Sequence, residues 1–171
     1  DLQALATARV VAVGDVMLDR YVYGAVERIS PEAPIPVLQI EREVAMLGGV
    51  GNVLRNLTAL GAAADLVAVI GADAAGREVA ALAAAEAGER CRLITQADRP
   101  TTIKERYIAG GQQLLRTDRE SARPLAPAIA ADVVAAAGAA LPAAGAMVLS
   151  DYGKGVLAPA ALGALIAAAR A

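Results

Sequence analysis

Two acidic residues follow a short apolar run near the N-terminus, and their position suggests contact with a ligand. Residues 10–13 (VVAV) lead into Gly14 and Asp15, and Asp19 comes four residues later. In an open parallel sheet, ligands bind at the carboxyl ends of the strands. Carboxylates at such an end can accept hydrogen bonds from ligand hydroxyls. The structural alternative is that one acid caps a turn and the other pairs with Arg20.

A glycine-rich stretch, LGGVGN at 47–52, precedes an amphipathic helical pattern. Glycine lets backbone amides approach a ligand closely, and a helix N-terminus offers unpaired N–H groups. Gly48, Gly49 and Asn52 are therefore candidate ligand contacts. The alternative is a tight turn in which Asn52 caps the helix. The stretch matches neither the dinucleotide fingerprint nor a P-loop.

Two cationic residues, Lys104 and Arg106, stand two positions apart on a predicted strand. Side chains at that spacing share one face of a sheet. A paired cationic face suits a phosphate or another anion, whereas the alternative is a solvated edge that deters aggregation. Arg116 and Asp118, on the next predicted strand, either complete this polar face or pair across it.

A last polar motif, SDYGKG at 150–155, again follows an apolar run. Asp151 is a candidate for binding hydroxyls and Lys154 for binding an anion. The alternative is an ordinary strand-to-helix turn made by the glycines.

The elements that must position these residues alternate along the chain. Apolar strand patterns cover 9–13, 65–71, 90–95 and 146–150, and helical patterns cover 51–61, 76–88, 127–141 and 159–170. Strands that alternate with helices predict a parallel sheet with helices on its faces.

A second, smaller sheet is predicted from two regions that break this alternation. Pro31, Pro34 and Pro36 exclude a central strand, so their region must be an edge or an excursion. Residues 101–120 read as two strands about a Gly110-Gly111 turn, which is a hairpin signal. We expect 22–46 and 101–118 to form one small sheet apart from the main one.

The bulk composition excludes several function classes. The 171 residues, enough for one domain, carry 16 basic and 18 acidic side chains, a net charge of −2. This predicts no general attraction to nucleic acid or membranes. Interruptions at Gly138, Pro142 and Gly145 argue against a membrane span at 133–150. A single cysteine cannot form an internal disulfide, which fits a reducing cytoplasm. The absence of histidine excludes His-based triads and metal sites with histidine ligands.

Together these motifs resemble the ribokinase-like (phosphofructokinase-B-type) sugar kinases. The stretches VVAVGDVMLDRY, RISPEAPIPV, LGGVGNV, TTIK, QQLLR and LSDYGKG are similar, within that family, to the D-glycero-β-D-manno-heptose 7-phosphate kinases. The resemblance runs in order over residues 9–171. It implies an α/β fold, a three-layer ribokinase-like sandwich with a mostly parallel central sheet and a small β lid.

The resemblance also implies a function. It implies ATP-dependent phosphorylation, with Mg²⁺, of the anomeric hydroxyl of heptose 7-phosphate, in ADP-heptose and lipopolysaccharide synthesis. It further implies a homodimer formed through the lid. Carried over by position, Asp19, Gly48, Gly49 and Asn52 line the sugar site, Lys104 and Arg106 lie near the sugar phosphate, and Asp151 and Lys154 close the pocket floor.

Some features depart from the family pattern. Val50 and Gly51 stand where two alanines are usual, and Val22 stands where an aromatic residue is common. The family's GAGD motif, which supplies the catalytic base and an anion hole, and its adenine-binding region do not occur in 1–171. We therefore expect the N-terminal, sugar-binding part of one truncated kinase domain, with no catalytic residue or metal ligand of its own and no activity alone.

Two other functions stay open at this point. One is a kinase of the same superfamily that acts on another sugar or on a nucleoside. The other is a non-catalytic sugar-binding or dimerisation module.

Overall fold

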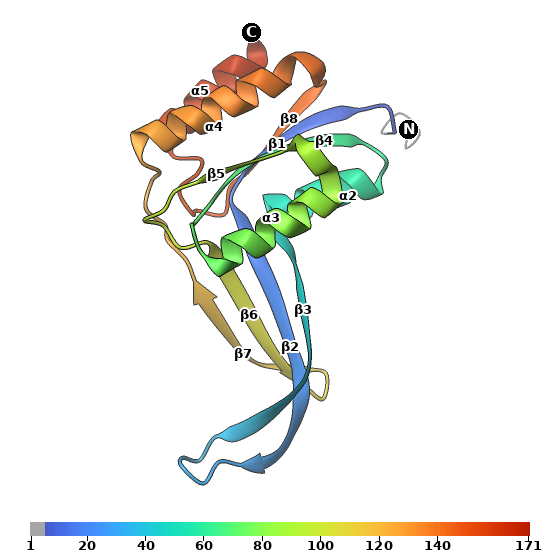
Figure 1. Ribbon diagram of the computed structural model, residues 1–171, viewed down its shortest axis with the longest axis vertical. Helices are drawn as coiled ribbons and strands as arrows, with labels where there is room; N and C mark the ends of the chain where they lie inside the picture. Colours follow the sequence, from blue (N-terminus) through green and yellow to red (C-terminus); the bar gives the residue numbers. More distant parts are fainter. Residues whose placement is uncertain (1–5) are drawn as a thin grey trace.

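The main sheet consists of four parallel strands in the order β5-β4-β1-β8. The computed structural model describes residues 6–171 (Figure 1). The strands are β1 (Arg9–Gly14), β4 (Ala63–Ile70), β5 (Cys91–Thr95) and β8 (Ala146–Ser150). All four predicted strands are confirmed, and β1 lies between β4 and β8.

Helices cover both faces of this sheet and make the three-layer fold predicted from the sequence. Val11 and Val13 of β1 pack into one core with the last two helices, and Ala12 packs into the other core with the first two. Figure 1 shows the two helix pairs on opposite sides of the sheet. The helices are α2 (Val50–Ala59), α3 (Ala74–Ala87), α4 (Pro127–Ala140) and α5 (Pro159–Arg170). Burial on both faces explains why β1 is an unbroken apolar run.

A second sheet of four strands, which we call the lid, extends away from the helices (Figure 1). Its strands, in the order β3-β2-β6-β7, are β2 (Val16–Ile29), β3 (Pro36–Gly49), β6 (Thr102–Ala109) and β7 (Gln112–Arg119). The separate small sheet is thus present, but the expected bounds 22–46 were too short. The lid begins at Val16 because β2 follows β1 after a single residue.

Turn-forming residues shape the two hairpins of the lid. Pro31 and Pro34 lie in the loop between β2 and β3, and Pro36 begins β3, an edge strand. Proline is tolerated there because an edge strand has one unpaired side. Gly110 and Gly111 both have positive φ, 56° and 80°, as a two-residue type I′ hairpin turn requires.

Asp73 fastens the start of α3 to the start of the lid strand β6. Its carboxylate accepts hydrogen bonds from the N–H of Gly76 at 2.8 Å, the N–H of Thr101 at 2.9 Å and the hydroxyl of Thr101 at 2.7 Å. Burial opposes ionisation of Asp73, but the hydrogen bonds from Thr101 and Gly76 outweigh it and lower the pKa of the carboxyl.

Between residues 6 and 171, no helix is long and apolar enough to cross a membrane.

We predict that Asp73→Ala lowers the free energy of unfolding by about 1.5–3 kcal/mol, because it removes a helix cap and leaves the Thr101 N–H unpaired. Because the folded-state pKa is depressed, this contribution is present above the ordinary carboxyl pKa. It is lost as the pH falls below about 4. Urea unfolding at several pH values measures both effects.

The matched control is Asp132→Ala, an exposed acid on α4 without a partner among residues 6–171. It should change stability by less than about 0.5 kcal/mol. Equal effects of the two substitutions would contradict the role given to Asp73.

Candidate functional site

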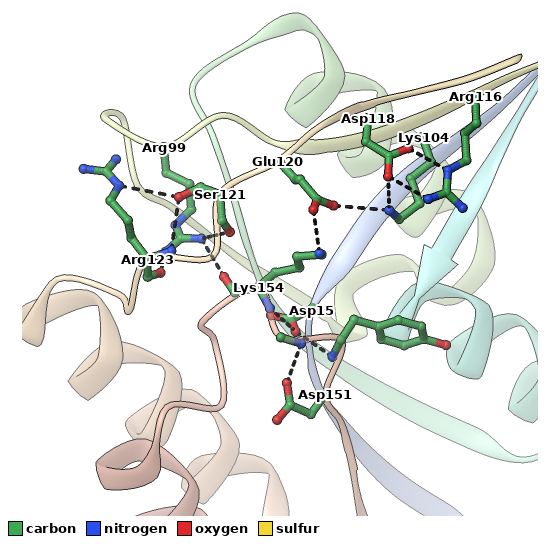
Figure 2. Close-up of polar contacts among 12 residues, drawn as sticks. Asp15, Arg99, Lys104, Arg116, Asp118, Glu120, Ser121, Arg123, Asp151 and Lys154 are labelled. Carbon is green, nitrogen blue, oxygen red and sulfur yellow. Dashed lines mark hydrogen bonds and ion pairs between the residues drawn. The ribbon is translucent and has the colours of Figure 1, made fainter.

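The carboxylate of Asp15 holds the loop that joins β8 to α5. Asp15 is only 1% exposed. Its carboxylate accepts the backbone N–H groups of Tyr152 at 2.8 Å, Lys154 at 3.0 Å and Val156 at 3.2 Å. Figure 2 shows Asp15 beside Lys154 at this loop. The structure therefore gives Asp15 the turn-capping role that the sequence left open.

The backbone of Asp15 also fixes the start of α2. Its carbonyl accepts the N–H of Val50 at 2.9 Å, and its own N–H donates to the Ser150 carbonyl at 3.1 Å. Gly49 is the N-cap residue of α2 with a φ of 58°, and a Cβ there would lie 2.1 Å from the Asp15 carbonyl oxygen. The alternative in which Asn52 caps the helix is wrong, because Gly49 is the N-cap residue and Asn52 lies within the first turn.

Asp19 lies on the lid strand β2 and pairs with a residue distant in sequence. Its Oδ1 accepts a hydrogen bond from Arg106 Nη1 at 2.7 Å. The alternative pairing with Arg20 is wrong, because successive side chains of a strand point to opposite faces. A Cβ on Gly48 would lie 2.1 Å from Asp19 Oδ2, so the glycine leaves room for this carboxylate.

Lys104 and Arg106 share one face of β6, as their spacing predicted, and both are paired. The Lys104 ammonium lies 2.8 Å from Asp118 and 3.2 Å from Glu120. Burial opposes its charge, but the hydrogen bonds to these two carboxylates outweigh burial and raise the pKa of Lys104. The Arg106 guanidinium lies 5.0 Å from the ring centroid of Tyr21. With its side chain 15% exposed, Lys104 is not part of a solvated edge.

These residues surround a cleft of about 460 Å³ on one face of the lid, bordered by the start of α2 and the loop after β8. Its lining comprises Met17, Asp19, Tyr21, Met46, Leu47, Gly49, Asn52, Lys104, Arg106, Arg116 and Tyr152. A carboxylate, an amide and three cations can bind hydroxyls and an anion, and the apolar and aromatic side chains can pack on a carbon skeleton.

A second cleft, of about 340 Å³, lies on the opposite face of the lid and includes Arg20, Asp73 and Glu105. None of the residues predicted from the sequence to bind the sugar or its phosphate lines it, although Asp118 does, so we take the first cleft as the candidate site.

The two candidates from the SDYGKG motif lie at or beyond the border of this cleft. The Lys154 ammonium reaches Glu120 at 2.8 Å, and Glu120 also binds Lys104. Asp151 is exposed, and its carboxylate accepts the N–H of Gly153 at 2.8 Å. In Figure 2 the Asp151 carboxylate points away from Lys104 and Glu120. The structure thus places Asp151 outside the cleft lining, because its side chain closes a turn within its own loop.

Several lining residues were missed by sequence reasoning. Tyr21 follows Asp19 by two positions, so the period of a strand would have found it if β2 had been predicted to start at Val16. Tyr152 lies inside a motif that had been recognised, but only its acid and lysine were considered. Met46 carries no chemical signal that distinguishes it from a core residue.

The departures from the family pattern lie outside the cleft. Val22 is 3% exposed and Val50 is fully buried, and Gly51 is buried at the start of α2. None of the three lines the cleft. These differences therefore concern packing beneath the site.

Comparison with known protein families assigns the chain to one of them. Residues 7–170 match the family described as "pfkB family carbohydrate kinase". The chain therefore belongs to the pfkB family. Among curated relatives, the "Bifunctional protein HldE" of Paramagnetospirillum magneticum is 57% identical over 157 residues, which are 92% of this chain and 32% of that protein. The "D-beta-D-heptose 7-phosphate kinase" of Bordetella bronchiseptica is 48% identical over 155 residues, 91% of this chain and 49% of that protein.

These relatives confirm the resemblance to heptose kinases seen in the motifs. The chain spans about a third of the length of the bifunctional relative and about half of the Bordetella kinase. Among solved structures, phosphofructokinase-2 from Escherichia coli in complex with substrates and products superposes with a TM-score of 0.72 at 21% identity. The superposition covers 96% of this chain and 50% of the phosphofructokinase-2 chain. It supports the ribokinase-like fold.

We predict that the two neighbouring acids differ sharply in their effect on stability. Asp15→Ala leaves three N–H groups without their acceptor and should lower the free energy of unfolding by about 3 kcal/mol or more. Asp19→Asn keeps the shape of a partly exposed side chain and should cost less than about 1 kcal/mol. Urea unfolding of both variants measures the difference. If Asp19→Asn proves as destabilising as Asp15→Ala, Asp19 is a structural residue.

Proposed function

We propose that the complete protein is an ATP-dependent carbohydrate kinase that phosphorylates the anomeric hydroxyl of D-glycero-β-D-manno-heptose 7-phosphate. Residues 1–171 would be the N-terminal, sugar-binding part of its kinase domain. The observation that carries the proposal is the placement of Asp19, Lys104 and Arg106 around one cleft. The names of the relatives, which are 46–57% identical, support the choice of a heptose phosphate.

Asp19 is the proposed acceptor for sugar hydroxyls. Arg106 binds its Oδ1, while Oδ2 accepts no hydrogen bond from any residue between 6 and 171. This oxygen lies over Gly48, where the absence of a side chain keeps the approach open. A carboxylate oxygen in that position can orient a sugar ring by accepting from its hydroxyls.

Lys104 and Arg106 are the proposed ligands of the phosphate that the sugar already carries. Both cations line the cleft, and Arg116 lines it beside them. Charge-assisted hydrogen bonds from ammonium and guanidinium groups are the strong contacts available to a phosphate. The ion pair with Asp19 holds the Arg106 guanidinium in place before a ligand arrives.

ATP and Mg²⁺ are the cofactors that the family implies, and the described residues do not fit them. Within residues 6–171, no group of three or more acidic, histidine or cysteine side chains is placed to hold a metal ion. The chain also lacks a P-loop. We propose that parts of the protein other than these residues supply the nucleotide site, the metal site and the catalytic base, and the short coverage of the relatives supports this proposal.

A second copy of the chain is the proposed partner of the lid. The lid carries several exposed apolar side chains: Val26, Ile29, Ile35, Ile40, Leu114 and Leu115. Exposed apolar side chains on the part of the lid that extends away from the helices favour association.

The kinase assignment is tested by the release of ADP from Mg-ATP in the full-length protein. Heptose 7-phosphate should be turned over with the highest kcat/KM among heptose 7-phosphate, fructose 6-phosphate and ribose. A clear preference for ribose or fructose 6-phosphate would support a related kinase with another substrate. Absence of turnover with any sugar would support a non-catalytic binding module.

We predict that Arg106→Ala in the full-length protein weakens the binding of heptose 7-phosphate by about 1.5–3 kcal/mol, roughly 10- to 150-fold in Kd. Isothermal titration measures this loss. Arg119→Ala is the matched control, because Arg119 lies on the other face of the lid and has no ion-pair partner among residues 6–171. Unchanged affinity in Arg106→Ala would remove Arg106 from the phosphate site.

We predict that the full-length protein is a dimer at micromolar concentration and that Ile40→Glu shifts it toward monomer. A buried charge without a partner is costly at an interface, and Ile40 is now 53% exposed. Analytical ultracentrifugation measures the mass. A wild-type protein that stays monomeric at high micromolar concentration would exclude the lid interface.

A further inference from the structure

Two lysines from different parts of the fold converge on one carboxylate. Glu120 is the first residue after the lid strand β7. Its Oε2 lies 3.2 Å from the ammonium of Lys104 on β6, and its Oε1 lies 2.8 Å from the ammonium of Lys154 in the loop between β8 and α5. Figure 2 shows Glu120 between the two lysines. A carboxylate thus stands where two cations point, at the border of the candidate site.

The backbone around this cluster is fixed by a buried arginine. Arg99 donates from Nη1 to the carbonyl of Lys154 at 2.7 Å and to that of Ser121 at 3.2 Å, and from Nη2 to the carbonyl of Arg123. Asp15 holds the N–H of Lys154 from the other side. Lys154 and the segment that follows β7 are therefore bound to the same guanidinium. This fixes the backbone positions from which the Lys154 and Glu120 side chains meet.

The charges of the cluster depend on Glu120 in different ways. Lys104 has a second carboxylate partner, Asp118, which Arg116 also binds at 2.9 Å. Glu120 is the only carboxylate that Lys154 contacts between residues 6 and 171. The hydrogen bond from Lys154 is the main cause that lowers the pKa of Glu120, so its carboxyl is ionised at neutral pH.

We propose that the Glu120 carboxylate occupies, in the ligand-free protein, the position taken by the phosphate of the substrate. The proposal rests on the function proposed above. An incoming phosphate monoester replaces the carboxylate between Lys104 and Lys154. Glu120 then turns outward, a movement open to it because its side chain is already 32% exposed.

The exchange requires that the incoming group carry a negative charge. A phosphate dianion compensates both ammonium groups, so the carboxylate can leave without uncovering a positive charge. A neutral hydroxyl in the same place would leave Lys154 without an anionic partner, in a position where its side chain is only 18% exposed. A sugar that carries a phosphate thus displaces Glu120, whereas a sugar without one binds with Glu120 still in place.

The test is Glu120→Gln in the full-length protein, titrated without nucleotide. Glutamine keeps the shape and removes the competing charge. Heptose 7-phosphate should bind about five- to tenfold more tightly to the variant than to the wild type. The affinity for the same heptose without its phosphate should change by less than about twofold, so that the gain belongs to the phosphate. Glu43→Gln, an exposed lid acid outside the cluster, controls for the loss of one negative charge and should leave both affinities unchanged.

The outcomes separate this inference from the proposed function. Equal or weaker binding of heptose 7-phosphate by Glu120→Gln, with normal binding by the wild type, would overturn the exchange and make Glu120 a residue that positions the lysines. Tighter binding of ATP with an unchanged affinity for the sugar phosphate would also overturn it. Absence of heptose 7-phosphate binding in wild type and variant alike would overturn the proposed function itself.

Discussion

The site depends on one buried carboxylate, that of Asp15, at the end of the central strand β1. A buried carboxylate is stable only when hydrogen bonds replace its lost hydration. Here it receives three backbone N–H groups from the loop after β8, while its own carbonyl receives the first N–H of α2. One residue therefore sets the positions of the glycine stretch, the SDYGKG loop and the central strand relative to one another.

The lid takes its position from the same point. Because β2 begins one residue after Asp15, the strand that carries Asp19 leaves the main sheet directly from this fixed end. The two acids of the opening motif therefore have different tasks. Asp15 holds the frame, and Asp19 faces the cleft in an ion pair with Arg106. Because the two acids are only four positions apart, the fixed backbone at Asp15 also determines where the Asp19 side chain lies on the lid.

Much of the fold could be predicted because its signals are local. The apolar run of β1, the proline-rich edge and the Gly110-Gly111 turn each constrain the backbone within a few residues. The incorrect predictions concern features that depend on tertiary contacts and not on local sequence. The buried residues 16–18 gave no sign that β2 had already begun. Asn52 is a good helix cap in isolation, but Gly49, with its positive φ, is the N-cap residue and makes the turn.

The ion pairs of the site could not be predicted, because the paired residues are distant in sequence. Asp19 meets Arg106, 87 positions away, and Lys154 meets Glu120, which no motif had singled out. Arg99, likewise unmarked in the sequence, contributes only through backbone carbonyls. Residue types indicated hydroxyl and anion binding, and only the structure shows which charges face each other.

The most direct measurement of the central claim is a crystal structure of the full-length protein with heptose 7-phosphate. This account predicts the sugar in the cleft between the lid and the loop after β8, with its hydroxyls on Asp19 and its phosphate within hydrogen-bond reach of Lys104. A sugar bound in the cleft on the opposite face of the lid, beside Arg20 and Glu105, would contradict the account.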